Sequence, residues 1–487
     1  MLKLHHLLIA SALAMAAPIA AAQTTPVFTD LRERDQLSPQ LQRQLTALSE
    51  QRGVGSIRVA QVSAESIRTI RTGEILEIPV APELILSARM LALESGSDGR
   101  SIWRGEITGT QDVPPGLATF VINGESVTGS VRTPDGRLYR VRPLGNGETA
   151  IIEMDYATLP RDHPPLEEGR DENNGNDDGS EPDIDRGGGG LQPDLPQIRP
   201  GQLQPLRQPE LRQPELRMQQ EAERPLRARI ERQFDPEILR LYEPNLTRLE
   251  LRYHNWANIV ERLRIPPVID VLVAYTDGAE DAAGDILGLI DLAIAETNDS
   301  FRNSGIWANV RLVGTLNVAY NERNRGYYTM RDHLINQGDA FLGRVHTRRN
   351  LTNADVVALI VDQDDYCGLA GGIGVEEEDA FVLVHWDCAT GYYSFGHEIG
   401  HLLGARHDPD TDSRNTPFAF GHGYRYEHSN SGWRTIMSYN CAANRCPSRL
   451  QYWSSPDTEY NSITMGNSDQ DNHRVWNLQA ADLASFR

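Results

Sequence analysis

Alternating apolar and polar residues fill the stretch from residue 101 to residue 157. Glycine, asparagine and aspartate turns separate the short runs SIWRGEITG, LATFVING, SVTGSVRT, RLYRVRPL and TAIIEMDYA. A period of two residues is typical of strands with one buried face. We therefore predict a small antiparallel β domain at about 100–158, preceded by a mixed, moderately helical stretch that starts at residue 23.

The apolar pattern changes in the last part of the chain, residues 266–487. Four runs predict buried strands: VIDVLVAYT, VRLVGTLNVAY, ADVVALIVDQ and AFVLVHWDC. Between them, 279–305 and 330–349 have helical apolar spacing, and the first of these helices is expected to end at Gly305. The order β-α-β-α-β-β predicts an α/β (α+β) fold, with a mixed sheet that has an antiparallel strand near its edge.

The sequence between these two units lacks apolar periodicity. Residues 161–216 contain the acidic, glycine-rich GRDENNGNDDGSEPDIDRGGGG and then proline-rich sequence in which RQPEL occurs twice in tandem. Such a composition cannot bury a core and predicts a disordered linker. Arginine and glutamate interleaved with isoleucine and leucine over 217–265 predict an exposed helical connector.

The first residues have the pattern of a secretory signal peptide. Lys3 precedes an apolar run from Leu7 to Ala17, and the small residues Ala20–Ala22 offer a cleavage site before Gln23. A membrane anchor is the alternative, but the run is shorter than the ~20 residues that span a bilayer. We predict a signal peptide over 1–22, no membrane span after its removal, and a secreted, extracellular protein, with the periplasm as the other destination.

Charge and cysteine content refine this picture. A net charge of -21 argues against nucleic acid or an anionic membrane as the main partner, since both repel an acidic surface.

The four cysteines of an exported chain suggest two disulfides, for which three connectivities exist. Because each pair brackets one local loop, Cys367–Cys388 and Cys441–Cys446 are favoured. Metal binding by these cysteines is the weaker alternative, because neither pair has CxxC spacing.

The chemistry concentrates in FGHEIGHLLGARHD, residues 395–408. On a helix, His397 and His401 lie on one face, one turn apart, and Glu398 stands beside the first. Gly404 can end the helix in a left-handed conformation, so that the chain turns and brings His407 to the same ion. Three neutral imidazoles with an open fourth position are the pattern of catalytic zinc. A polar helix with surface histidines is the alternative.

A second signature follows in RTIMSYN, where Met437 lies thirty residues after His407. HExxHxxGxxH followed by a methionine turn resembles the metzincin zinc endopeptidases. In Asp408, directly after the third histidine, the chain resembles the adamalysin/reprolysin-like branch, which has an aspartate at this position. HEIGHLLGARHD, FGHGYRY, GWRTIMSYN, YWSSPD and the ending NHRVWNLQAADLASFR together most resemble bacterial peptidyl-Asp metalloendopeptidases. The resemblance covers 266–487 and extends to the β unit before it.

The resemblance implies a metzincin-like catalytic domain over 266–487 with one zinc ion on His397, His401 and His407. Glu398 would be the general base and then the acid. Met437 would form a hydrophobic floor under the metal. Asp408 would lie behind the metal ligands without binding the metal itself. A tyrosine at the position of Tyr439 approaches the zinc or the oxyanion in the astacin and serralysin branches, whereas adamalysins generally lack it. A transition-state stabiliser and a buried structural tyrosine therefore both remain open for Tyr439.

Substrate recognition is a further expectation. If the resemblance extends to cleavage before aspartate, the pocket beyond the zinc should be cationic, and Arg445 and Arg449 follow the methionine turn. Solvent-facing arginines are the alternative. The predicted strand at 380–388 could pair with an extended substrate. Two further histidines, His385 and His422, are interpreted as structural, since three ligands already complete the pattern.

The N-terminal region, 23–160, is expected to act as a propeptide. A secreted protease with such a region is plausibly a zymogen, and the region itself would be the inhibitor. No cysteine precedes Cys367, which excludes a thiolate switch, so an aspartate, glutamate or histidine of this region or steric cover alone remain open. The acidic stretches at 362–365 and 376–379 could bind Ca²⁺, but without EF-hand spacing solvated loops are favoured.

These observations predict a secreted zinc metalloendopeptidase that hydrolyses protein or peptide substrates with a zinc-activated water. An inactive metzincin-like binding protein is the alternative, and the intact Glu398 and three histidines argue against it. A metallohydrolase that acts on a non-peptide bond is a further alternative, which the resemblance disfavours. The natural substrate and the oligomeric state stay open.

Overall fold

The computed structural model describes residues 24–81, 83–109, 115–164, 166, 266–428, 431–442 and 445–487. They divide into two compact units, one up to Met154 and one from Asp155 onward. The predicted signal peptide, the connector 217–265 and nearly all of the predicted linker lie outside the described residues; 161–164 and 166 are the exceptions. Within the described part of the chain, none of the helices has the length and apolar character needed to cross a membrane.

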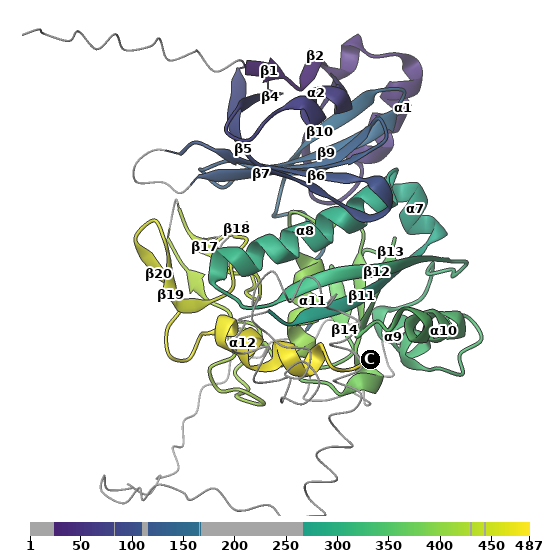
Figure 1. The fold of residues 1–487 in the computed structure, drawn as a ribbon, viewed down its shortest axis with the longest axis vertical. Coiled ribbons are helices and arrows are strands. Elements are labelled where there is room, and N and C mark those ends of the chain that lie inside the picture. Colours follow the sequence, from purple (N-terminus) through teal and green to yellow (C-terminus); the bar gives the residue numbers. More distant parts are fainter. Residues whose placement is uncertain are drawn as a thin grey trace, which may run out of the picture. The chain divides into compact units, whose positions relative to one another are not determined.

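The first unit is built on one large β-sheet (Figure 1). Its order is β1-β4-β5-β6-β7-β8-β9-β10-β3-β2. All neighbouring strands run antiparallel except β1 and β4, which are parallel. The elements are β1 (Thr24–Pro26), β2 (Phe28–Arg32), α1 (Pro39–Ser49), β3 (Val54–Val62), α2 (Ala64–Thr69), β4 (Ile75–Ala81), β5 (Leu84–Ser95), β6 (Ser101–Ile107), β7 (Gly116–Asn123), β8 (Ser126–Arg132), β9 (Leu138–Gly145) and β10 (Glu148–Met154).

The predicted antiparallel β region is confirmed, but its strands begin far earlier than residue 100. Residues 23–95, expected to be mixed and moderately helical, contribute β1 to β5 to the same sheet. In β5, Leu86, Ala88 and Met90 are buried and alternate with exposed residues, which is the period of a strand. The pairing of β3 with β10 joins segments far apart in the sequence, and local pattern alone does not reveal such a partner.

The second unit contains a five-stranded mixed sheet in the order β12-β11-β13-β15-β14. The first four strands are parallel and β14 is antiparallel, at the edge, as the mixed-sheet prediction required. The strands are β11 (Val268–Thr276), β12 (Asn309–Val318), β13 (Val356–Val361), β14 (Gly368–Ala370) and β15 (Phe381–His385); the helices are α7 (Asp277–Ala283), α8 (Ile286–Ser304), α9 (Tyr327–Ile335), α10 (Gly343–Thr352), α11 (Ser394–Leu402) and α12 (Asn472–Leu483). Short sheets complete it: β16 (Arg425–Tyr426), β17 (Trp433–Arg434) and β18 (Ser448–Arg449), then β19 (Ser455–Tyr460) and β20 (Ile463–Met465).

Local signals account for several of these elements. Helix α8 ends at Gly305, which has a left-handed φ of 68°, as predicted. The stretch predicted as one helix over 279–305 is divided, because α7 ends at Gly284, which has a φ of 76°, and Asp285 caps the start of α8. The single helix predicted over 330–349 is wrong, because α9 and α10 are separate. Between them Asn336 accepts a hydrogen bond from the N–H of Gly338, and Asp339 accepts from those of Phe341 and Leu342. Such side-chain bonds to nearby backbone compete with helix and form turns.

The edge of this sheet is the surface open to another strand. β15 lies between β13 and β14, so the strand predicted to receive a substrate is already paired on both sides and that prediction is corrected. The outer strand is β14. Just before it, the N–H of Cys367 donates to the carbonyl of Arg161 at 2.9 Å, in a parallel bridge between Arg161 and Tyr366. Residues 155–166 therefore belong structurally with this unit.

Candidate metal centre

Helix α11 carries the first two histidines of the predicted site. His397, Glu398 and His401 are all buried on it. The helix ends where expected, because Gly404 has a φ of 103° and its N–H donates to the carbonyl of His401 at 2.9 Å. The chain then reverses and brings His407 back towards the helix.

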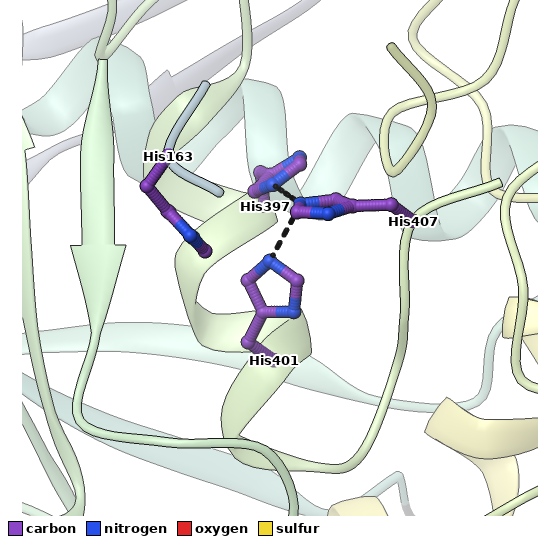
Figure 2. A group of neighbouring side chains, drawn as sticks. All are labelled: His163, His397, His401 and His407. Carbon is purple, nitrogen blue, oxygen red and sulfur yellow. Dashed lines mark hydrogen bonds between the residues drawn. The ribbon is translucent and has the colours of Figure 1, made fainter. Parts of the chain in front are cut away.

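Three imidazoles converge in the way the sequence predicts (Figure 2). His407 Nε2 lies 3.1 Å from His401 Nε2 and 3.3 Å from His397 Nε2. The Nδ1–H of His397 donates to the carbonyl of Ile436 at 2.9 Å, and that of His401 to the carbonyl of Ala405 at 2.8 Å. With Nδ1 as the donor, each Nε2 lone pair faces the common centre. Lone pairs that face one another repel unless a cation lies between them, so the residues fit a metal ion.

Burial sets the protonation of these rings. It lowers the pKa of His397 and lowers the pKa of His401 and His407 well below the usual value. All three are therefore neutral at pH 7, which is the form that binds a metal. Neutral imidazoles suit Zn²⁺.

A fourth histidine completes the group. His163 is fully buried, and one ligand atom from each of the four histidines lies within 4.8 Å of the others. Its Nδ1 bonds the carbonyl of Pro164 at 2.6 Å, so that Nε2 points into the cluster (Figure 2). The sequence predicts that His163 lies in the linker, residues 161–216. The only local signal was that His163 is the one histidine between His6 and His254.

Glu398 lies beside the cluster in a site shielded from water. Its Oε2 is 3.3 Å from His163 Nε2. Burial is the largest single effect and lowers the pKa of His163, but the charge and hydrogen bond of Glu398, with the carbonyl of Pro164 and the charge of Asp162, together outweigh it and raise that pKa. Gly368 on β14 makes room for this carboxylate, because a Cβ there would lie 2.4 Å from Glu398 Oε1.

The methionine turn packs beneath the helix. Met437 is fully buried, and its Sδ is 3.3 Å from the place a Cβ on Gly400 would occupy, one residue before His401. Asp408 is buried and links this turn to the loop that carries His407. It accepts from the N–H of Tyr439 at 3.0 Å and pairs with Arg425 at 3.1 Å.

Tyr439 stands at the cluster rather than behind it. Its ring centroid is 4.6 Å from that of His407, and its O–H donates to the carbonyl of His163. Burial raises the pKa of Tyr439 well above its usual value, so the phenol stays a donor. Tyr439 therefore offers an O–H donor at the cluster, and this donor reaches a backbone carbonyl.

The two candidate specificity arginines separate. Arg445 is half exposed and pairs with Glu427, in keeping with the solvent-facing alternative. Arg449 is fully buried and pairs with Asp162, with Nη1 3.3 Å from Oδ1. Its guanidinium carbon also lies 4.0 Å from the ring centroid of Tyr392.

The remaining predicted residues surround this centre. Both favoured disulfides, Cys367–Cys388 and Cys441–Cys446, are formed. The Nδ1–H of His422 donates to the carbonyl of His407 at 2.8 Å, and neither His422 nor His385 belongs to the metal group. Among the described residues, no second group of three or more histidine, cysteine or acidic ligand atoms comes together, so the acidic stretches at 362–365 and 376–379 gain no support as Ca²⁺ sites.

Comparison with known proteins identifies the family. A reprolysin-type model of metallo-peptidase family M12 matches residues 266–454. A peptidyl-Asp metalloendopeptidase of Stenotrophomonas maltophilia is 33% identical over 96% of this chain and 95% of its own length. The chain belongs to the M12 metallopeptidases. It is a zinc metalloendopeptidase, as predicted, and its substrates are peptides or proteins.

Other relatives have the same character. A Xanthomonas campestris protein, also a peptidyl-Asp metalloendopeptidase by name, is 33% identical over 92% of this chain and 89% of its own length. Among solved structures, metalloproteinase-II from Bacteroides fragilis covers 85% of this chain and 92% of its own at 11% identity. Its TM-score of 0.39 is too low to support an argument.

Proposed function

We propose that this metallopeptidase is secreted as a precursor and cleaves peptide bonds on the N-terminal side of aspartate. The observation that carries the catalytic part is the convergence of three buried Nε2 atoms, with that of His407 3.1 and 3.3 Å from the other two, beside a buried carboxylate. His397, His401 and His407 would hold the zinc ion. When bound, zinc would supply Lewis acidity, which lowers the pKa of a water and polarises the scissile carbonyl.

The chain's own groups do the rest of the chemistry. Glu398 takes the proton of the attacking water and delivers it to the leaving amine, since it stands next to a ligand and is held in a low-dielectric site. Tyr439 donates its O–H to the substrate's carbonyl oxygen as negative charge develops there. Its present bond to the carbonyl of His163 supports this role. Met437 supports the ligands from below by packing.

Two observations support cleavage before aspartate. The relatives from Stenotrophomonas and Xanthomonas are peptidyl-Asp metalloendopeptidases by name. In this chain, Arg449 offers a buried guanidinium near the cluster, and a guanidinium binds a carboxylate with two parallel hydrogen bonds.

The N-terminal sequence supports the proposal of secretion, and segment 155–166 supports the proposal of latency. The apolar pattern of residues 1–22 supports export. His163 stands where a fourth ligand would, so a substrate could not reach the metal while this segment is in place. The N-terminal region would therefore inhibit its own enzyme until it is removed.

The catalytic assignment is tested with Glu398→Gln. This variant should keep one zinc per chain, measured by atomic absorption, because the three ligands are unchanged. It should lose casein hydrolysis, because an amide cannot take the proton. Glu378→Gln, on an exposed glutamate, is the matched control and should behave as wild type. A fully active Glu398→Gln protein would refute the mechanism, and cleavage-site mapping in a proteome digest tests the preference for aspartate.

A further inference from the structure

Two adjacent residues of the precursor occupy the two positions that a substrate needs. Asp162 pairs with buried Arg449, and His163 meets the three histidines. Flanking contacts hold the pair in place. The carbonyl of Arg161 accepts from the N–H of Cys367 at 2.9 Å, and the carbonyl of Leu166 accepts from Arg406 at 3.2 Å.

The environment of Arg449 is that of a carboxylate receptor. Within the catalytic domain, Arg449 donates hydrogen bonds to two backbone carbonyls, those of Tyr392 and Ser438, each at 3.3 Å. In the described part of the chain its one ion-pair partner is Asp162, whose side chain is 3% exposed. A buried guanidinium that loses its carboxylate is strongly destabilised, so once the segment leaves, Arg449 favours another carboxylate in the same place.

The spacing matches the proposed cleavage. An enzyme that cuts before aspartate must bind the aspartate side chain immediately next to the bond at the metal. Asp162 is immediately followed by His163, whose imidazole reaches the metal ligands. In a substrate the scissile bond precedes the aspartate, so the segment occupies the two positions with its chain running in the direction opposite to a substrate. The group at the cluster is a side chain and not a peptide bond, while the carbonyl of His163 is held by Tyr439. The segment therefore fills both positions without offering a bond to cut.

We infer that Asp162 and His163 form a two-point latch, in which Asp162 occupies the substrate's aspartate site on Arg449 and His163 takes the open position of the metal. This rests on the proposed function, which supplies the endopeptidase site and its preference for aspartate. It makes Arg449 the residue that recognises aspartate and leaves Arg445 without that role.

The first test measures access to the metal rather than activity. The full chain is loaded with Co²⁺, whose visible spectrum reports its ligands, and acetohydroxamate is added as a small metal-binding probe. His163→Ala should bind the probe at least about 100-fold more tightly than wild type, because a tethered ligand competes at roughly millimolar effective concentration. Asp162→Asn should give an intermediate gain. Asp155→Asn, on an exposed aspartate of the same segment, should match wild type.

Two outcomes of this titration would overturn the latch. One is equal probe affinity for wild type and His163→Ala. The other is an Asp162→Asn protein that behaves as Asp155→Asn does. Stoichiometric Co²⁺ in each variant shows that the site is folded, so a defect in folding is recognised separately.

The second test addresses Arg449. In the full chain that carries Asp162→Asn together with His163→Ala, so that neither position is held by the segment, two fluorogenic peptides are compared that differ only in aspartate or asparagine after the scissile bond. Arg449→Gln should reduce the aspartate preference about 10-fold or more, since a site built for a carboxylate rejects its neutral analogue. Arg449→Lys should recover part of it, and Arg445→Gln should keep all of it. Unchanged preference in Arg449→Gln would overturn the assignment.

The two levels of the proposal fail in different ways. If the Asp162→Asn, His163→Ala double variant opens the metal to acetohydroxamate but cleaves neither peptide, the endopeptidase proposal fails and the latch stands. If the wild-type full chain binds the probe freely and cleaves both peptides as fast as the double variant, the latch fails and the endopeptidase stands.

Discussion

Gly368 makes room for the carboxylate of Glu398, the proposed general base, and we predict that replacing the glycine with alanine displaces that carboxylate. The new Cβ would lie 2.4 Å from Glu398 Oε1, 2.6 Å from its Cγ and 2.7 Å from its Cδ, whereas ordinary contact begins at 3.4 Å. The carboxylate must therefore move by about 1 Å, and a displacement of that size at a reacting group costs about 100-fold in rate. The stability cost should be small, about 1 kcal/mol, because a side chain can rotate away more easily than backbone.

The assay compares Gly368→Ala with wild type in active preparations. We expect kcat/KM on a fluorogenic peptide to fall about 100-fold. Zinc content should stay at one per chain, because the Nδ1 hydrogen bonds that orient His397 and His401 are untouched. Gly338→Ala is the control, since its new Cβ would have 3.5 Å to its nearest neighbour. Activity within twofold of wild type would show that Gly368 does not position Glu398.

Three other predictions concern the same unit. Tyr439→Phe should lower kcat about 10-fold with little change in KM or zinc content, and an unchanged kcat would remove the phenol from the reaction. The EDTA-treated protein should lose thermal stability as the pH falls from 6.5. The pKa values of His397, His401 and His407 are lowered in the folded state, so the unfolded chain takes up more protons, whereas the raised pKa of His163 opposes this effect. A melting temperature that stays constant from pH 7 to pH 5 would contradict the prediction. Replacing the Cys367–Cys388 pair, at a separation of 21 residues, with serines should lower the free energy of unfolding in urea by about 3 kcal/mol. The same change at Cys441–Cys446, at a separation of 5 residues, should lower it by less, because the closed loop is shorter. The reverse order would count against the loop-entropy reasoning.

Short-range features of this chain could be predicted because their causes are local. The spacing of His397 and His401 predicts one face of a helix, and Gly404 supplies the turn that returns His407. The buried run of β11 and the end of α8 at Gly305 have the same kind of cause. Both disulfides close short loops, which made their pairing the favoured one.

Other features depended on residues that meet only in the folded chain. Asp162 and Arg449 are 287 residues apart, and nothing near either residue marks the other. Arg445 and Arg449 look alike in the sequence, yet one is half exposed and the other is buried against Tyr392. The early strands of the first unit likewise needed partners from distant segments.

The physical distinction is between local sequence patterns and contacts that form only when distant segments fold together. Helical periodicity, caps and turns act over a few residues, so the sequence by itself determined the candidate zinc-binding motif, the glutamate proposed as the general base and the class of reaction. Which further side chain joins the three histidines, and which arginine is buried beside a carboxylate, depends on packing between segments far apart in the chain. Only the tertiary structure, by bringing His163 and Asp162 into the site, decided those.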